Sequence, residues 1–173
     1  MIKGKDILLR AVELSDAATI FEWENDSKLW HISGTRLPYS MYEIEQYVLN
    51  AGSSIETTGQ YRFIIEQNRE MVGILDLFDY EHQHRRAGIG ILINDKFRNR
   101  GIAQEALNLL CNYCFTELDF NQLWATVSIE NETSLSLFRR IGFKEVGIKK
   151  SWTFYKGELH DEVFLQLLHP KLR

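Results

Sequence analysis

The feature that most constrains the fold is a short basic turn between an apolar run and an amphipathic helix. The run Ile89–Ile93 is apolar throughout and predicts a buried strand. Beyond the turn, small and apolar residues recur at helical spacing, at Ala103, Ala106, Leu107, Leu110 and Cys114. We therefore expect a helix that begins near Gly101 and packs one face against the sheet.

The start of that helix predicts an anion site. The first turn of a helix has N–H groups without intrahelical partners and lies at the positive end of the helix dipole. Gly101 has no side chain to block a ligand, and Arg98 and Arg100 add positive charge. These groups suit a phosphate or pyrophosphate. The alternative is an ordinary exposed basic helix start, and neither the G-x-G-x-x-G nor the Walker pattern is present.

Composition narrows the class of protein. The 173 residues, without repeats or a linker, predict one domain over residues 1–173. A net charge of −4 gives no reason to expect a nucleic-acid partner. The sequence shows no apolar run of ~20 residues and no signal peptide, so we expect a cytoplasmic protein with no membrane partner. Cys111 and Cys114 fall mid-helix, which favours burial over a redox or metal site, and no metal is expected.

The remaining periodicity predicts a mixed α/β fold. Strands are expected at residues 7–10, 61–66, 71–78, 86–94, 123–128, 146–155 and 159–168. Helices are expected after caps at Ser15 or Asp16 and at Ser40, then from Gly101 to about Leu118 and over 131–141. This order predicts a central, mostly antiparallel seven-stranded sheet with helices on both faces.

Two motifs resemble signatures of the GNAT superfamily of N-acetyltransferases. Arg98-x-x-Gly101-x-Ala103 is similar to the family's pyrophosphate loop, [QR]-x-x-G-x-[GA]. About 30 residues later, the stretch Asn131–Phe143 is similar to N-x-x-[SA]-x-x-[LI]-[YF]-x-[KR]-x-G-F. Both motifs stand in the expected order and in strand–helix context, and the resemblance covers nearly the whole chain.

The resemblance implies a sheet whose central strands splay apart, with acetyl-CoA as cosubstrate in the gap. Asn131 could alternatively be only a helix N-cap. The cosubstrate-binding residues that the resemblance implies are Ile91, Leu92, Ile93, Arg98, Asn99, Arg100, Gly101, Ile102, Ala103, Asn131, Ser134 and Phe138.

The acceptor is less constrained. The stretches His84-Arg85-Arg86-Ala87 and Tyr155-x-Gly157-x-x-x-Asp161 resemble bacterial spermidine/diamine N-acetyltransferases, and equally the ribosomal-protein N-acetyltransferase branch. The leading hypothesis is direct acetyl transfer to a primary amine of a polyamine or diamine such as spermidine. The alternatives are the N-terminal amine of a ribosomal or other protein, and a non-catalytic acyl-CoA-binding protein. Homo-oligomerisation is left open.

The sequence departs from the polyamine pattern at three places. Phe138 stands where these enzymes usually have a tyrosine that protonates the leaving thiolate, and phenylalanine has no proton to donate. Gly88 stands on the central strand where these enzymes often have a glutamate. Trp30, His31 and Ser33 stand where an acidic pair is expected. Thiolate departure would then rely on water or on Tyr155.

The chemistry suggests what the remaining residues must do. An alkylammonium of pKa ~10.4 must lose a proton before it attacks, at a cost of about 4 kcal/mol at pH 7.4. Juxtaposing the reactants can contribute about 7–11 kcal/mol, so positioning outweighs any single base. We expect Asp76 and Asp79 to anchor a cationic acceptor, unless they merely face solvent. His82, His84 and Tyr155 are candidate proton relays, and His84 is a further candidate for binding the acceptor.

Overall fold

The computed structural model describes residues 1–30, 35 and 37–172. Its strands are β1 (Ile2–Lys3), β2 (Leu8–Ala11), β3 (Tyr61–Gln67), β4 (Glu70–Glu81), β5 (Arg86–Ile93), β6 (Gln122–Ser128), β7 (Lys144–Tyr155) and β8 (Glu158–Leu168). Its main helices are α1 (Ala17–Glu24), α3 (Met41–Asn50), α4 (Ile55–Thr58), α5 (Ile102–Thr116) and α6 (Glu132–Ile141). Short 3-10 turns cover Leu14–Asp16, Asp95–Phe97 and Pro170–Leu172.

The strands form one sheet in the order β1-β2-β3-β4-β5-β6-β8-β7. All neighbouring strands are antiparallel except β5 and β6, which are parallel. The mixed, mostly antiparallel fold is therefore confirmed. Within the described residues the sheet has eight strands rather than seven, because the two-residue β1 pairs with β2.

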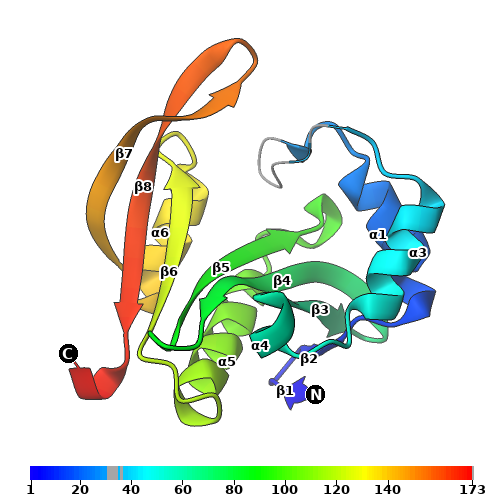
Figure 1. Cartoon of the computed structure of the whole chain (residues 1–173), viewed down its shortest axis with the longest axis horizontal. Helices are drawn as coiled ribbons and strands as arrows, with labels where there is room; N and C mark the ends of the chain where they lie inside the picture. Colours follow the sequence, from blue (N-terminus) through cyan, green and yellow to red (C-terminus); the bar gives the residue numbers. More distant parts are fainter. Residues whose placement is uncertain (31–34, 36, 173) are drawn as a thin grey trace.

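Helices cover both faces of the sheet, as the order of the elements predicts. Ile64 and Ile74 belong to a cluster with Ile20 of α1 and Ile44 of α3. Neighbouring positions on the same strands face the other way, into the larger core under α5 and α6. Figure 1 shows α1 and α3 apart from α5, and the hairpin of β7 and β8 extending as a wing beyond α6.

Of the two predicted helix caps, the one at Ser40 is confirmed. Ser40 and Glu43 form a capping box at the start of α3. Two tight hairpin turns have left-handed backbone, at Asn68–Arg69 and Lys156–Gly157. Between α3 and β3, residues Ile55–Thr58 form the short helix α4. Asp16 precedes α1 but makes no side-chain capping bond, because its carboxylate accepts from Arg10 and from the Glu13 N–H.

The two cysteines lie within α5 and are both buried and unbridged. Burial raises the pKa of the Cys114 thiol, which makes it unreactive. This confirms the prediction that the pair belongs to the core. No group of three metal-ligating side chains occurs within the described part of the chain. None of the helices described there is long and apolar enough to cross a membrane.

Candidate active site

The site begins at the basic turn between β5 and α5, which is held together by its own side chains. Arg98 Nε donates to the carbonyl oxygen of Ile93 at 3.1 Å, and Arg98 Nη2 lies 2.8 Å from Asp95 Oδ1. The Arg100 guanidinium lies over the Phe97 ring, 5.4 Å from its centroid. Arg98 thus contributes to the shape of the turn as well as to its charge.

Two helices begin beside the split in the sheet, and their first turns differ. Gly101 precedes α5 with φ of 79° and no side-chain capping bond, and a side chain there would meet nothing within 4 Å. Asn131 precedes α6, and its side-chain oxygen accepts from the Ser134 N–H at 3.1 Å. The start of α6 is therefore satisfied within the chain, so Asn131 is an N-cap, the alternative role considered for it. The start of α5 presents N–H groups to an open surface.

The split between β5 and β6 opens into a cavity that we call the strand cleft. The two strands pair only where Arg86, Ala87 and Gly88 face residues 122–124. Beyond Gly88 they diverge, as Figure 1 shows, so β5 has no described strand partner on that edge. The cleft has a volume of about 550 Å³ and is lined by β5, β6, the first turns of α6 and the wing. This is the predicted splay of the central strands.

Several predicted residues line the strand cleft together. Ile91 lies on its β5 side, and Asn131, Ser134 and Phe138 lie on its α6 side. The Phe138 ring is 3% exposed and packs edge-on against Phe143, with centroids 5.0 Å apart. The strand cleft therefore brings predicted residues of β5 and α6 together in one cavity.

The ring of Phe78 fills the space beside Gly88, where the sequence departs from the polyamine pattern. A side chain at Gly88 would come within 2.4 Å of the Phe78 ring on the neighbouring strand β4. The glutamate that related enzymes often carry at this position would not fit here without moving Phe78. Phe78 instead lies between the strand cleft and a second cavity, and it lines both of them together with Gly90.

The second cavity, which we call the acidic cavity, has a volume of about 630 Å³. It lies between the sheet and helices α1 and α3. Its described lining includes three carboxylates, Glu24, Glu43 and Asp76, against one guanidinium, Arg62. Tyrosine side chains supply much of the remaining surface, at Tyr39, Tyr47 and Tyr61. The cavity therefore has a net negative charge, and the faces of its tyrosine rings suit an aliphatic cation.

Asp76, the expected cation anchor, already has a partner. Arg62 Nε and Nη2 each lie 2.8 Å from one Asp76 oxygen, and Arg62 Nη1 lies 2.8 Å from Glu24 Oε1. Burial lowers the pKa of Arg62, but the charge and hydrogen bonds of Asp76 outweigh it and hold the pKa above its ordinary value. Sequence reasoning missed Arg62 and Glu24. Because Arg62 pairs with Asp76 and Glu24, Glu43 is the carboxylate of the cavity that is not bound to Arg62.

The structure does not bring Asp79 and His84 into either cavity. Both are exposed, Asp79 in the β4 bulge with φ of 48°, and His84 in the turn after β4, 4.0 Å from Glu81. His82 lies 3.2 Å from the Tyr80 hydroxyl on the same outer turn. Among the unusual residues after α1, His31 and Ser33 lie outside the described residues, whereas Trp30 donates to the Glu24 carbonyl.

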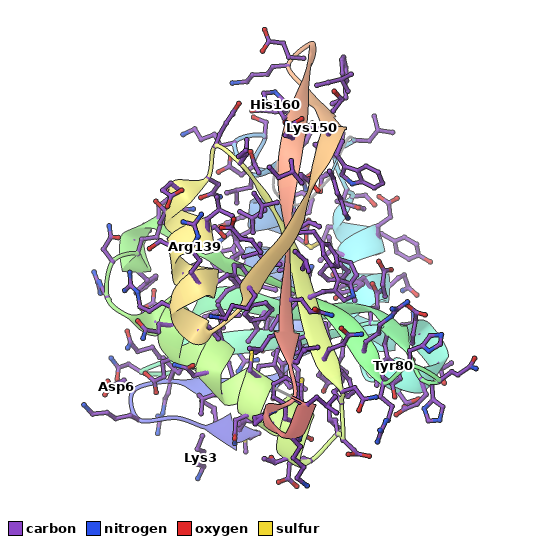
Figure 2. The ribbon with its side chains drawn as sticks, turned by 90° about the vertical axis from the view of Figure 1, so that its left-hand side faces the viewer. Lys3, Asp6, Tyr80, Arg139, Lys150 and His160 are labelled. Carbon is purple, nitrogen blue, oxygen red and sulfur yellow. The ribbon has the colours of Figure 1, made fainter. Side chains whose placement is uncertain are left out.

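The wing adds a polar end to the strand cleft, made of the predicted Tyr155 and of two residues that sequence reasoning missed, His160 and Glu162. Tyr155, Glu162 and His160 all line it, and His160 Nδ1 lies 3.2 Å from Glu130 Oε1. The hydrogen bond to Glu130, aided by the backbone carbonyl of Tyr155, raises the pKa of His160 above its ordinary value. Both partners accept hydrogen bonds, so they favour the imidazolium, in which each ring nitrogen donates. Figure 2 shows His160 toward the outer end of the wing.

A sheet split between two parallel strands, with an open helix start at one end of the split, is the arrangement of an acyl-CoA-dependent transferase. The chain belongs to the GNAT acetyltransferase family, because the family model described as "Acetyltransferase (GNAT) domain" matches residues 6–144. GNAT acetyltransferases use acetyl-CoA, so the chain is an acetyl-CoA-dependent acyltransferase. This sets aside the hypothesis of a non-catalytic acyl-CoA-binding protein.

Individual relatives agree with that assignment. The spermidine N(1)-acetyltransferase of Escherichia coli (strain K12) is 26% identical over 163 residues, 94% of this chain and 86% of that protein. The crystal structure of spermidine N-acetyltransferase from Vibrio cholerae in complex with CoA and spermine superposes with a TM-score of 0.85 and 26% identity, covering 96% and 97% of the two chains. A putative ribosomal N-acetyltransferase of Bacillus subtilis, YdaF, is 33% identical over 98 residues, 57% of this chain and 54% of that protein.

Proposed function

We propose that this enzyme transfers an acetyl group directly from acetyl-CoA to a primary amine, and that the leading acceptor is a polyamine or diamine such as spermidine. The observation that carries the proposal is the acidic cavity, which adjoins the strand cleft at Phe78 and Gly90. Its three carboxylates against one guanidinium favour an acceptor with more than one positive charge.

The strand cleft and the basic turn fit the cosubstrate. Bound acetyl-CoA supplies an activated acetyl thioester. The uncapped start of α5 at Gly101, together with Arg98 and Arg100, suits the pyrophosphate. The unpaired edge of β5 at Ile91–Ile93 offers backbone groups to an extended amide-bearing arm. The remaining members of the proposed set are Leu92, Asn99, Ile102, Ala103, Asn131, Ser134 and Phe138.

The acceptor needs positioning more than it needs a strong base. Carboxylates of the acidic cavity attract an ammonium but also oppose its deprotonation, so their contribution is to binding. Holding the neutral amine in place offsets the cost of about 4 kcal/mol for its deprotonation. Phe138 cannot protonate the leaving thiolate, so we assign proton movement to water and to polar groups on the wing. Tyr155 and Glu162 line the cleft and are the candidates among the described residues.

A second candidate acceptor is the N-terminal amine of a ribosomal or other protein. The observation that favours it is the 33% identity to the putative ribosomal N-acetyltransferase over 98 residues. Homo-oligomerisation is a further part of the proposal, supported by a dodecameric structure of spermidine N-acetyltransferase from Vibrio cholerae.

The test is acetyl-CoA turnover, read by thiol release, with spermidine, a short diamine and peptides with free N-termini. We expect spermidine to have the highest kcat/KM and its advantage to shrink as salt is raised, because screening weakens attraction of a polycation. A peptide that is acetylated far better than every polyamine would overturn the acceptor assignment in favour of the protein N-terminus.

A further inference from the structure

Three aromatic rings from three strands surround the ammonium of Lys149. Its Nζ lies 4.7 Å from the ring centroid of Trp152 on β7, 5.1 Å from that of Phe164 on β8 and 5.8 Å from that of Trp124 on β6. All three distances fall within the range in which a cation is attracted to the face of a ring. We call these three rings the aromatic cage.

Two of the three rings, Trp124 and Phe164, are held in place by aromatic neighbours. Trp124 and Phe164 stack with centroids 5.7 Å apart, and Phe78 packs edge-on against Trp124 at 5.1 Å. Trp124 and Phe164 are only partly buried, and Trp152 is 62% exposed. The cage is therefore built on a packed pair of rings and closed on one side by the exposed ring of Trp152.

The two neighbouring lysines of β7 differ in what holds their charge. Lys150 Nζ lies 2.6 Å from Asp161 Oδ2, and its side chain is 73% exposed. Lys149 is partly buried, and no carboxylate of the described residues lies within ion-pair distance of its Nζ. Its ammonium is held by rings alone, which is how proteins recognise alkylammonium ligands in aromatic cages.

The cage adjoins the strand cleft. Lys149 pairs across the ladder with Glu162, and Phe164 pairs with Thr126, and paired residues of antiparallel strands project from the same face. Glu162 and Thr126 both line the strand cleft. Phe78, which supports Trp124, lines the cleft and the acidic cavity. A long cation that places one amine in the strand cleft therefore lies next to the aromatic cage.

We propose that Trp124, Trp152 and Phe164 form a binding site for an alkylammonium group of the acceptor, and that Lys149 occupies this site until the acceptor displaces it. The lysine ammonium has the same chemistry as a polyamine terminus, so the two compete for one site. The inference rests on the proposed function in taking the acceptor to carry a second ammonium. A distal ammonium in the cage stays charged while another amine of the same molecule reacts.

The experiment replaces Lys149 by methionine, which keeps an unbranched apolar side chain of similar length. The matched control is Lys150→Met, which removes the same charge one residue away; Figure 2 shows Lys150 on the wing. Binding of tetramethylammonium, at constant ionic strength, is followed by tryptophan fluorescence. We expect Lys149→Met to bind it about three- to fivefold more tightly than wild type, and Lys150→Met to match wild type. Equal gains in both variants, or no gain in Lys149→Met, would overturn the proposal.

A double variant decides whether the rings are responsible. Because Trp152 is largely exposed, Trp152→Leu should fold, and in the Lys149→Met background it should remove the gain. A gain that persists would show that the cation binds elsewhere. With spermidine as substrate, Lys149→Met should lower KM and leave kcat little changed. If wild type and variants alike fail to acetylate spermidine, the proposed acceptor is wrong, whereas the tetramethylammonium result still decides the cage.

Discussion

The strand cleft and the acidic cavity share Phe78 and Gly90 but are built from different materials. The strand cleft exists because two parallel strands stop pairing after Gly88, and it offers backbone edges, hydroxyls and an amide, with Glu130, Glu162 and His160 at its wing end. The acidic cavity lies between a continuous part of the sheet and two helices, and it offers carboxylates and phenols. The strand cleft is suited to a long neutral arm that ends in phosphates, and the acidic cavity is suited to a cation.

Under the proposed function, backbone geometry selects acetyl-CoA, and side-chain charge selects the acceptor. The groups that suit acetyl-CoA are mostly main-chain groups at a strand edge and a helix start, which many sequences can supply. The groups that suit the acceptor are a few charged side chains, such as the Arg62 triad and Glu43. A change in acceptor therefore needs only a few substitutions, while the cleft can stay constant.

The largest expected effect comes from Gly101→Asp, which puts a side chain and a negative charge at the uncapped start of α5. We expect acetyl-CoA affinity, measured by calorimetry, to fall by about tenfold or more, because the change opposes both the dipole and the arginines. The control is Gly59→Asp, since Gly59 also has left-handed backbone, with φ of 71°, and open space around it. Equal losses in both variants would point to backbone strain rather than to the anion site.

A smaller effect is expected from Glu43→Gln in the acidic cavity. It should raise the KM for spermidine by about two- to fivefold with little change in kcat, because it removes attraction that is equal in ground and transition states. Glutamine can still complete the capping box with Ser40, so the melting temperature should change little. Glu45→Gln, an exposed position on the same helix that does not line the cavity, should leave the KM unchanged. A similar rise in both variants would deny the cavity a specific role.

The smallest expected effect concerns the outer end of the strand cleft. The hydrogen bond to Glu130 raises the pKa of His160, so the stabilisation from this pair is fully present below about pH 6.5 and is lost as pH rises through the raised pKa. In an NMR titration, Glu130→Gln should lower the pKa of His160, and Glu158→Gln should lower it less. A pKa that does not respond to Glu130→Gln would show that the pair does not form.

The sequence predicted what depends on local spacing. The strand, basic turn and helix over residues 89–116 follow from apolar periodicity and one glycine, and the cap at Ser40 follows from its local sequence. The cross-strand partners were not predictable in the same way. A bulge between Ile65 and Glu66 shifts the register of β3 and β4, so Arg62 faces Asp76 instead of its neighbour Leu75.

The same limit explains the aromatic cage and the position of Phe78. The register of β7 and β8 shifts between Lys149 and Thr153, which places Trp152 beside Lys149 in a way that alternation alone does not give. Phe78 and Gly88 are complementary in size, but they come from different strands. Non-local pairs of this kind depend on register, and register depends on bulges that leave no clear signal in the sequence.

The most direct test of the account is to measure the KM of both substrates in the two variants Gly101→Asp and Glu43→Gln. If the two cavities divide the work as proposed, Gly101→Asp raises the KM for acetyl-CoA and leaves that for spermidine near wild type. Glu43→Gln does the reverse. If each variant instead raises both KM values by similar factors, or if Gly101→Asp affects only spermidine, the division between the strand cleft and the acidic cavity is wrong.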